Sequence, residues 1–141
     1  MVNIFYEDVE VLDVSPEFFV SWLTKVCVME RVELGELSLI FCSDEYLLNM
    51  NKEHLNHDYY TDIITFDYSE SGVVSGDLFI SLERVKENAD HLKELFNVER
   101  NRVVVHGLLH LIGYRDKSVE EKVEMRERES AALALIVPRE T

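Results

Sequence analysis

Two histidines one helical turn apart place the strongest constraint on this chain. His106 and His110 lie in the apolar segment Val103–Ile112. Positions i and i+4 share one face of a helix, so both imidazoles can reach one metal ion. Gly113 follows, where a helix can end in a conformation that glycine tolerates. The chain can then turn back and bring the Asp116 carboxylate to the same ion. The segment therefore predicts a helix that carries a three-ligand metal site.

A surface interpretation competes with metal binding, because a histidine pair can be half-buried by chance and short motifs often mislead. The composition of the segment favours the metal. It is apolar nearly all round, which predicts a buried helix, and buried imidazoles need polar partners. One metal ion serves two imidazoles on the same face. The apolar positions are Val103, Val104, Val105, Leu108, Leu109, Leu111 and Ile112.

The residue after His106 argues against a peptidase. Metalloproteases of the His-Glu-x-x-His type carry their general base there, whereas this chain has Gly107. A glycine inside a helix costs about 1 kcal/mol relative to alanine, so we expect it to allow close approach of a metal, a substrate or another backbone. Two imidazoles and one carboxylate leave a coordination position open, as in catalytic sites. We expect one divalent ion, zinc first, with manganese, iron or nickel as alternatives.

Length and charge limit the range of functions. A chain of 141 residues fits one domain. The net charge of −14 argues against loose, sequence-independent binding to nucleic acid. A local basic cleft is compatible with it, and the cations that flank the histidine segment are Arg100, Arg102, Arg115 and Lys117. Arg115 and Lys117 adjoin the predicted third ligand, so they are the preferred candidates for binding a substrate.

The sequence also bears on location and redox state. No apolar run approaches the ~20 residues needed to span a bilayer, and Met1–Glu10 lacks the basic residues of a secretory signal. We therefore expect a cytoplasmic protein without a membrane partner. Cys27 and Cys42 are too few for a disulfide framework, and we expect both to be small buried residues without a function.

The hydrophobic pattern predicts a small α+β (α/β-like) domain over residues 1–141. Strands are expected at 2–6, 36–42, 62–66 and 76–81, the last two forming a hairpin across a loop at 68–75. Helices are expected after the capping residues Ser15, Ser43 and Ser118, over 81–96 and, carrying the histidines, over 98–112. One mixed sheet of about four strands then packs with about five helices, with the histidine helix central and buried.

Three motifs resemble those of a known family. His106–Asp116 reads His-Gly-Leu-Leu-His-Leu-Ile-Gly-Tyr-Arg-Asp. It resembles the His-Gly-x-Leu-His-Leu-x-Gly-Tyr-Asp-His signature of the YbeY-type endoribonucleases, bacterial factors of ribosomal RNA maturation. Thr61–Phe66 resembles the family's Thr-Asp-Val-Leu-Ser-Phe strand, and Gly76–Ile80 resembles its Gly-Asp-Ile-x-Ile strand. Order, spacing and length agree, so the resemblance covers nearly the whole chain.

The resemblance implies a metal-dependent, single-strand-specific endoribonuclease. Its implied role is maturation of the 3′ end of small-subunit (16S) ribosomal RNA and ribosome quality control. The implied partners are the precursor RNA, the small ribosomal subunit and its associated proteins, whereas DNA is not expected. The resemblance also implies a zinc-type ion held by His106, His110 and the residue at 116.

The chain departs from the family pattern at three positions. Asp116 stands where the family usually has histidine, and aspartate is itself a competent ligand. Asp67 stands where proline usually follows the phenylalanine. Leu55 stands where an arginine linked to RNA handling is usual, a departure that calls phosphate contact, and hence catalysis, into question. The candidates to replace that contact are His54, His57 and Arg115.

Asp62 and Asp77 have two interpretations. Each can orient an imidazole or the attacking water, or accept turn hydrogen bonds at a strand end. The main hypothesis is a hydrolase in which a metal-activated water attacks an RNA phosphodiester. The alternative is a non-catalytic ribosome-assembly protein with a structural metal site. Hydrolysis of another small substrate is a third hypothesis, because no residue identified here reads a base or a sugar.

Overall fold

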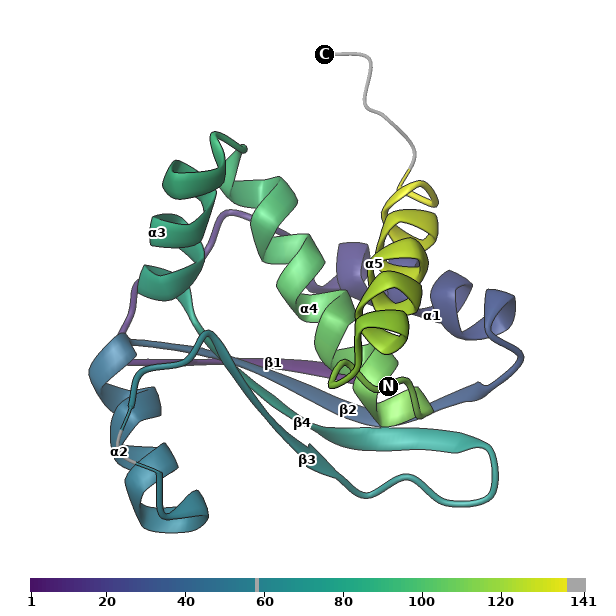
Figure 1. The fold of residues 1–141 in the computed structure, drawn as a ribbon, viewed down its shortest axis with the longest axis horizontal. Coiled ribbons are helices and arrows are strands. Elements are labelled where there is room, and N and C mark those ends of the chain that lie inside the picture. Colours follow the sequence, from purple (N-terminus) through teal and green to yellow (C-terminus); the bar gives the residue numbers. More distant parts are fainter. Residues whose placement is uncertain (58, 137–141) are drawn as a thin grey trace.

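A computed structural model describes residues 1–57 and 59–136. Within them, a four-stranded sheet packs with five helices (Figure 1). This is the α+β fold that the hydrophobic pattern predicted. The elements in chain order are β1 (Val2–Glu7), α1 (Pro16–Met29), β2 (Glu33–Cys42), α2 (Asp44–Leu55), β3 (Ile63–Asp67), β4 (Val73–Ser81), α3 (Leu82–Leu92), α4 (Phe96–Ile112) and α5 (Val119–Leu133).

The sheet is mixed, with strand order β1-β2-β4-β3. β1, β2 and β4 are parallel, and β3 pairs antiparallel with β4 in the predicted hairpin. β4 begins at Val73, so the predicted loop at 68–75 was too long. Val73 and Val74 pair with Glu33 and Leu34 at the start of β2. That pairing joins segments far apart in the chain, which local periodicity does not encode.

Serine side chains begin four of the helices. Each accepts a hydrogen bond from the backbone N–H three residues on, which satisfies one of the free donors of the first turn. The caps are Ser15, Ser43, Ser81 and Ser118. The helix predicted over 81–96 ends earlier, at Leu92. Lys93 adopts a left-handed φ of 57°, and the Glu94 N–H closes the turn on the Ala89 carbonyl.

Helix α4 is the central element. It packs against β3 and β4 on one side and contacts α3 and α5 (Figure 1). Its buried positions include Val104, Leu108 and Leu111. α2 lies on the opposite side of the sheet, where Leu47 packs with Ile64 in a separate small apolar cluster (Figure 1). The histidine helix is therefore central and buried, as predicted, and it lies between the sheet and α5.

Gly107 allows α4 to approach the sheet closely. A Cβ atom at this position would lie 2.6 Å from Ile63 Cδ1 and 3.0 Å from Leu78 Cδ2. The sequence led us to expect a metal, a substrate or another backbone near Gly107, but the nearest neighbours are side chains of β3 and β4, because the helix packs directly onto the sheet. Gly107 thus fixes the depth at which the helix, and the histidines it carries, sits on the sheet.

The two cysteines are buried and unpaired, as expected. Burial raises the pKa of the Cys27 thiol to about 11 and that of the Cys42 thiol to about 12. Both stay protonated at neutral pH, which suits small core residues. Among the described residues, no helix combines the length and apolarity needed to cross a membrane.

Replacement of Gly107 by alanine tests the close contact. We expect Gly107→Ala to lower the free energy of unfolding by about 1–3 kcal/mol, because the added methyl group overlaps Ile63 and Leu78. Helix propensity alone favours alanine by about 1 kcal/mol. Urea denaturation measures the difference, with the exposed Glu127→Ala as a control expected within about 0.5 kcal/mol of wild type. A stabilised Gly107→Ala protein would contradict the packing.

Candidate metal centre

The last two turns of α4 bring the histidines together. His106 Nε2 and His110 Nε2 lie 3.1 Å apart, and the two rings meet edge to face with centroids 4.6 Å apart. Both side chains are half-buried on one face of the helix. The i, i+4 spacing thus produces the shared face expected of it.

Gly113 ends α4 and reverses the chain. Its φ of 126° lies in the region that favours glycine, and its N–H donates to the carbonyls of Leu109 and His110. The turn brings Asp116 Oδ2 to 3.3 Å from His106 Nε2 and to 3.3 Å from His110 Nε2. The structure therefore assembles the three predicted ligands around one point.

The hydrogen bonds of the two rings show what this point can hold. His106 Nδ1 is 2.6 Å from Glu129 Oε2, and His110 Nδ1 is 3.1 Å from the Tyr114 carbonyl oxygen. A carboxylate and a carbonyl accept, so both Nδ1 atoms donate. Each Nε2 then presents a lone pair toward the Asp116 carboxylate. With both rings neutral, three acceptors face one another without a donor, an arrangement that a metal ion, or a proton added to one imidazole, would bridge.

The spacing of the three acceptors fits a zinc-type ion. Ligand atoms at about 2.0–2.2 Å from a tetrahedral ion lie about 3.3–3.6 Å from one another. The observed separations of 3.1, 3.3 and 3.3 Å are close to that range. His106, His110 and Asp116 can therefore hold one divalent ion with little movement of their side chains.

Glu129 on α5 supports the first ligand, and the sequence analysis missed it. It is 4 % exposed and accepts the His106 hydrogen bond. Carboxylates in this position fix the orientation of a metal-binding imidazole and raise its basicity. The available signal was its place on the buried face of α5, between Met125 and Ala132. An acidic residue on an apolar helix face needs a partner, but the pattern does not say which one.

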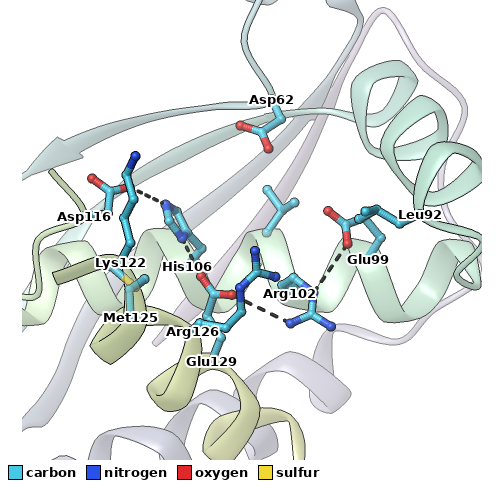
Figure 2. A pocket seen from close by; sticks show the side chains of 11 residues that line it. Asp62, Leu92, Glu99, Arg102, His106, Asp116, Lys122, Met125, Arg126 and Glu129 are labelled. Atoms are coloured by element: carbon cyan, nitrogen blue, oxygen red, sulfur yellow. Dashed lines mark hydrogen bonds and ion pairs between the residues drawn. The ribbon is translucent and has the colours of Figure 1, made fainter. Parts of the chain in front are cut away.

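Arg102 joins Glu129 to a second buried acid. Arg102 Nη1 lies 3.7 Å from Glu129 Oε1, and Arg102 Nε lies 3.5 Å from Glu99 Oε1 (Figure 2). Burial raises the pKa of Glu99, and the Arg102 charge partly offsets this. Burial alone would lower the pKa of His106, but the surrounding carboxylates, Glu129 first, raise it above its usual value. The site as a whole is an environment that favours positive charge.

A hollow of about 310 Å³ opens beside His106 and Asp116. Asp62 lies directly before β3 and faces this hollow across from His106 (Figure 2). Burial raises the pKa of Asp62, while the His106 charge and backbone hydrogen bonds at Asp62 and Ile63 lower it in part. Asp62 therefore has features of both interpretations. It accepts backbone hydrogen bonds at a strand end, and it faces the hollow beside the histidines.

The other predicted residues lie elsewhere. Asp77 accepts a hydrogen bond from the Tyr68 hydroxyl at 3.3 Å. It alternates along β4 with Leu78, which faces α4, so Asp77 points to the opposite face of the sheet. This position does not support a role in orienting an imidazole. Arg115 lines a different hollow, and Lys117 is exposed without lining the hollow beside the histidines.

Leu55 and the two replacement candidates next to it, His54 and His57, are also separate from the site. Leu55, the last residue of α2, is 40 % exposed. His54 packs its ring edge to face against Phe66, and His57 stacks on Tyr59. None of the three lines the hollow beside His106.

Comparison with known proteins shows to which family this chain belongs. The family model described as Endoribonuclease YbeY matches residues 6–136. The chain belongs to the YbeY family. Family membership confirms the resemblance seen in the motifs and indicates a hydrolase of the endoribonuclease class.

Individual relatives cover most of the chain. An Endoribonuclease YbeY from Cytophaga hutchinsonii is 53 % identical over 116 residues, which are 82 % of this chain and 81 % of that protein. One from Phocaeicola vulgatus is 43 % identical over 136 residues, which are 96 % of this chain and 99 % of that protein. The solution structure of a Thermotoga maritima protein is similar, with a TM-score of 0.67 and 25 % identity. The match covers 94 % of this chain and 87 % of that one.

Removing the charge of Glu129 tests its support of His106. We expect Glu129→Gln to weaken zinc binding about 10- to 100-fold, because the amide holds the imidazole less firmly and lowers its basicity. Competition with a chromophoric chelator measures the affinity, and circular dichroism checks the fold. The matched control is Glu127→Gln, an exposed position on the same helix. Equal zinc affinity of the two variants would show that Glu129 does not support metal binding by His106.

Proposed function

We propose that this protein is a metal-dependent, single-strand-specific endoribonuclease that matures the 3′ end of small-subunit ribosomal RNA. The observation that carries the proposal is the convergence of His106 Nε2, His110 Nε2 and Asp116 Oδ2 beside an open hollow. Membership of the YbeY family supports the reaction class. The further proposed roles are ribosome quality control and association with the small subunit and its proteins in the cytoplasm.

Three ligands beside a hollow favour a catalytic site over a structural one. Structural zinc sites are usually closed by four protein ligands, whereas catalytic sites use three and keep a position for water or substrate. A divalent ion held here supplies a Lewis acid for the phosphoryl oxygen and lowers the pKa of water. The non-catalytic assembly protein is therefore the less favoured alternative. The relatives of this chain are named endoribonucleases, which also favours a catalytic site.

The side chains around the three ligands have distinct proposed tasks. Glu129 and the Tyr114 carbonyl hold the Nδ1 protons of His106 and His110, so both Nε2 atoms stay available as ligands. Asp62 faces the hollow and is not one of the ligands. Burial raises its pKa, which makes the carboxylate a stronger proton acceptor. We assign Asp62 as the group that accepts a proton from the attacking water.

The donor set bears on the identity of the ion. Two imidazoles and one carboxylate suit zinc, which we propose as the ion of this site. Asp116 brings a negative charge and a hard oxygen, where the family usually has histidine. The site should therefore accept manganese or iron more readily than a three-histidine site does, and nickel is a further alternative.

Removal of the second histidine tests the proposal. We expect His110→Ala to lose the bound metal and to lose RNA cleavage by at least two orders of magnitude, because two remaining ligands hold a divalent ion weakly. Metal analysis and a single-stranded RNA cleavage assay on nuclease-free protein measure the two effects. His91→Ala, on the exposed end of α3, is the control. Cleavage that survives in His110→Ala would falsify the hydrolase proposal.

Substitution of the third ligand tests the metal preference. We expect Asp116→His to keep a bound ion and to favour zinc over manganese more strongly than the wild type, because imidazole replaces a hard oxygen donor. Asp116→Ala should weaken the binding of both ions. Competition titrations with the two metals measure the ratio of affinities. An Asp116→Ala protein with wild-type affinity for both would show that Asp116 is not a ligand.

A further inference from the structure

Two cations on α5 line the same hollow as the metal ligands. Lys122 and Arg126 border it together with His106 and Asp116. They are four residues apart on one helix, so they share a face and stand about 6 Å apart along its axis. Figure 2 shows Lys122 extending from α5 past Asp116. The sequence analysis did not single out either residue.

These two cations are not committed to internal ion pairs. Arg102 is held by Glu99 and Glu129, and Arg128, also on α5, is bound to Glu30 at 2.6 Å. Lys122 and Arg126 are exposed, and neither side chain forms a hydrogen bond or ion pair within the described part of the chain. Arg126 lies near enough to the buried Glu99 to lower that carboxyl's pKa, which places its charge at the hollow.

The charge balance of the hollow depends on the metal. Four carboxylates and three cations line it, namely Asp62, Glu99, Asp116, Glu129, Arg102, Lys122 and Arg126. Their formal sum is minus one, and one divalent ion changes it to plus one. A chain with a net charge of −14 thereby acquires a local site that attracts an anion.

The lining of the hollow favours contact with a phosphate backbone. Its apolar lining consists of Leu92, Val103 and Met125, without an aromatic ring on which a base could stack. Lysine and arginine are the usual protein partners of phosphate oxygens. Contacts of this kind hold a nucleic acid strand in place and do not read its bases.

We propose that Lys122 and Arg126 form a phosphate-binding subsite that holds the RNA backbone next to the metal centre. The inference rests on the proposed function and adds the residues that bind the substrate. The subsite lies on α5, on the other side of the sheet from α2 and Leu55 (Figure 1). Recognition at this subsite does not depend on base sequence.

The salt dependence of RNA binding tests the subsite. The probe is a short single-stranded RNA with 2′-O-methyl groups, which resists cleavage, and the protein is loaded with zinc. Each phosphate contact contributes about 0.7 to the slope of log affinity against log salt. We therefore expect Lys122→Gln/Arg126→Gln to lower the slope by about 1.4 and the affinity roughly 25-fold at about 0.1 M salt. With cleavable RNA, KM should rise more than kcat falls.

A matched variant distinguishes the effect of the subsite from the effect of lowering the overall positive charge of the protein. Lys25→Gln/Arg31→Gln removes the same charges from exposed positions on and after α1, and it should keep the wild-type slope. A third variant, Arg115→Gln/Lys117→Gln, tests the pair preferred from the sequence. Circular dichroism and zinc content verify that each variant is folded and loaded.

Each outcome supports or overturns the inference. A loss of slope confined to Lys122→Gln/Arg126→Gln supports it. Equal losses in all three variants, or a loss confined to Arg115→Gln/Lys117→Gln, would overturn it. If the loaded wild type binds and cleaves RNA and Lys122→Gln/Arg126→Gln matches it, only the subsite fails. If the loaded wild type does neither, the proposed function itself fails.

Discussion

The meeting of two imidazole nitrogens and one carboxylate oxygen at a single point is the constraint on which the rest of this structure depends. Acceptors that face one another repel unless a cation lies between them, so the surrounding protein must hold them in place. α4 provides the first two through its 3.6-residue turn. Gly113 provides the third by ending the helix where Asp116 can turn back. Gly107, on the face of α4 toward the sheet, lets the helix sit close to β3 and β4.

Two buried acids and a half-buried arginine support His106 from behind. Glu99, Arg102 and Glu129 link α4 to α5 and end at the Nδ1 atom of His106. Removing ionised groups from water is expensive, and their mutual attraction offsets the cost only when each has partners. Replacing such a network by apolar residues often leaves stability unchanged or improved. The network is therefore better explained by its effect on His106 than by a contribution to folding.

The local features of the fold could be predicted from the sequence because they depend on neighbours in the chain. Serine caps, the i, i+4 histidine pair and the glycine stop all act within one or two helical turns, and the structure contains them. The start of β4 and the end of α3 were missed because they depend on pairing with β2 and on a left-handed Lys93. The face of the sheet on which Asp77 lies could have been predicted from the sequence. Strand alternation with the inward Leu78 already places Asp77 outward.

The residues around the ligands were harder to predict, for a physical reason. Glu129, Lys122 and Arg126 lie on α5, and only the packing of α5 against α4 brings them to the histidines. A solvated lysine and a lysine beside a metal look alike in a charged helix. The proposed ligand Asp116 bears on their role, because an anionic carboxylate makes the net charge of the centre one unit lower than a neutral histidine would. Under the proposed phosphate subsite, the cations on the neighbouring helix would restore the positive charge that an approaching phosphate encounters, which would link the carboxylate at 116 to the composition of α5.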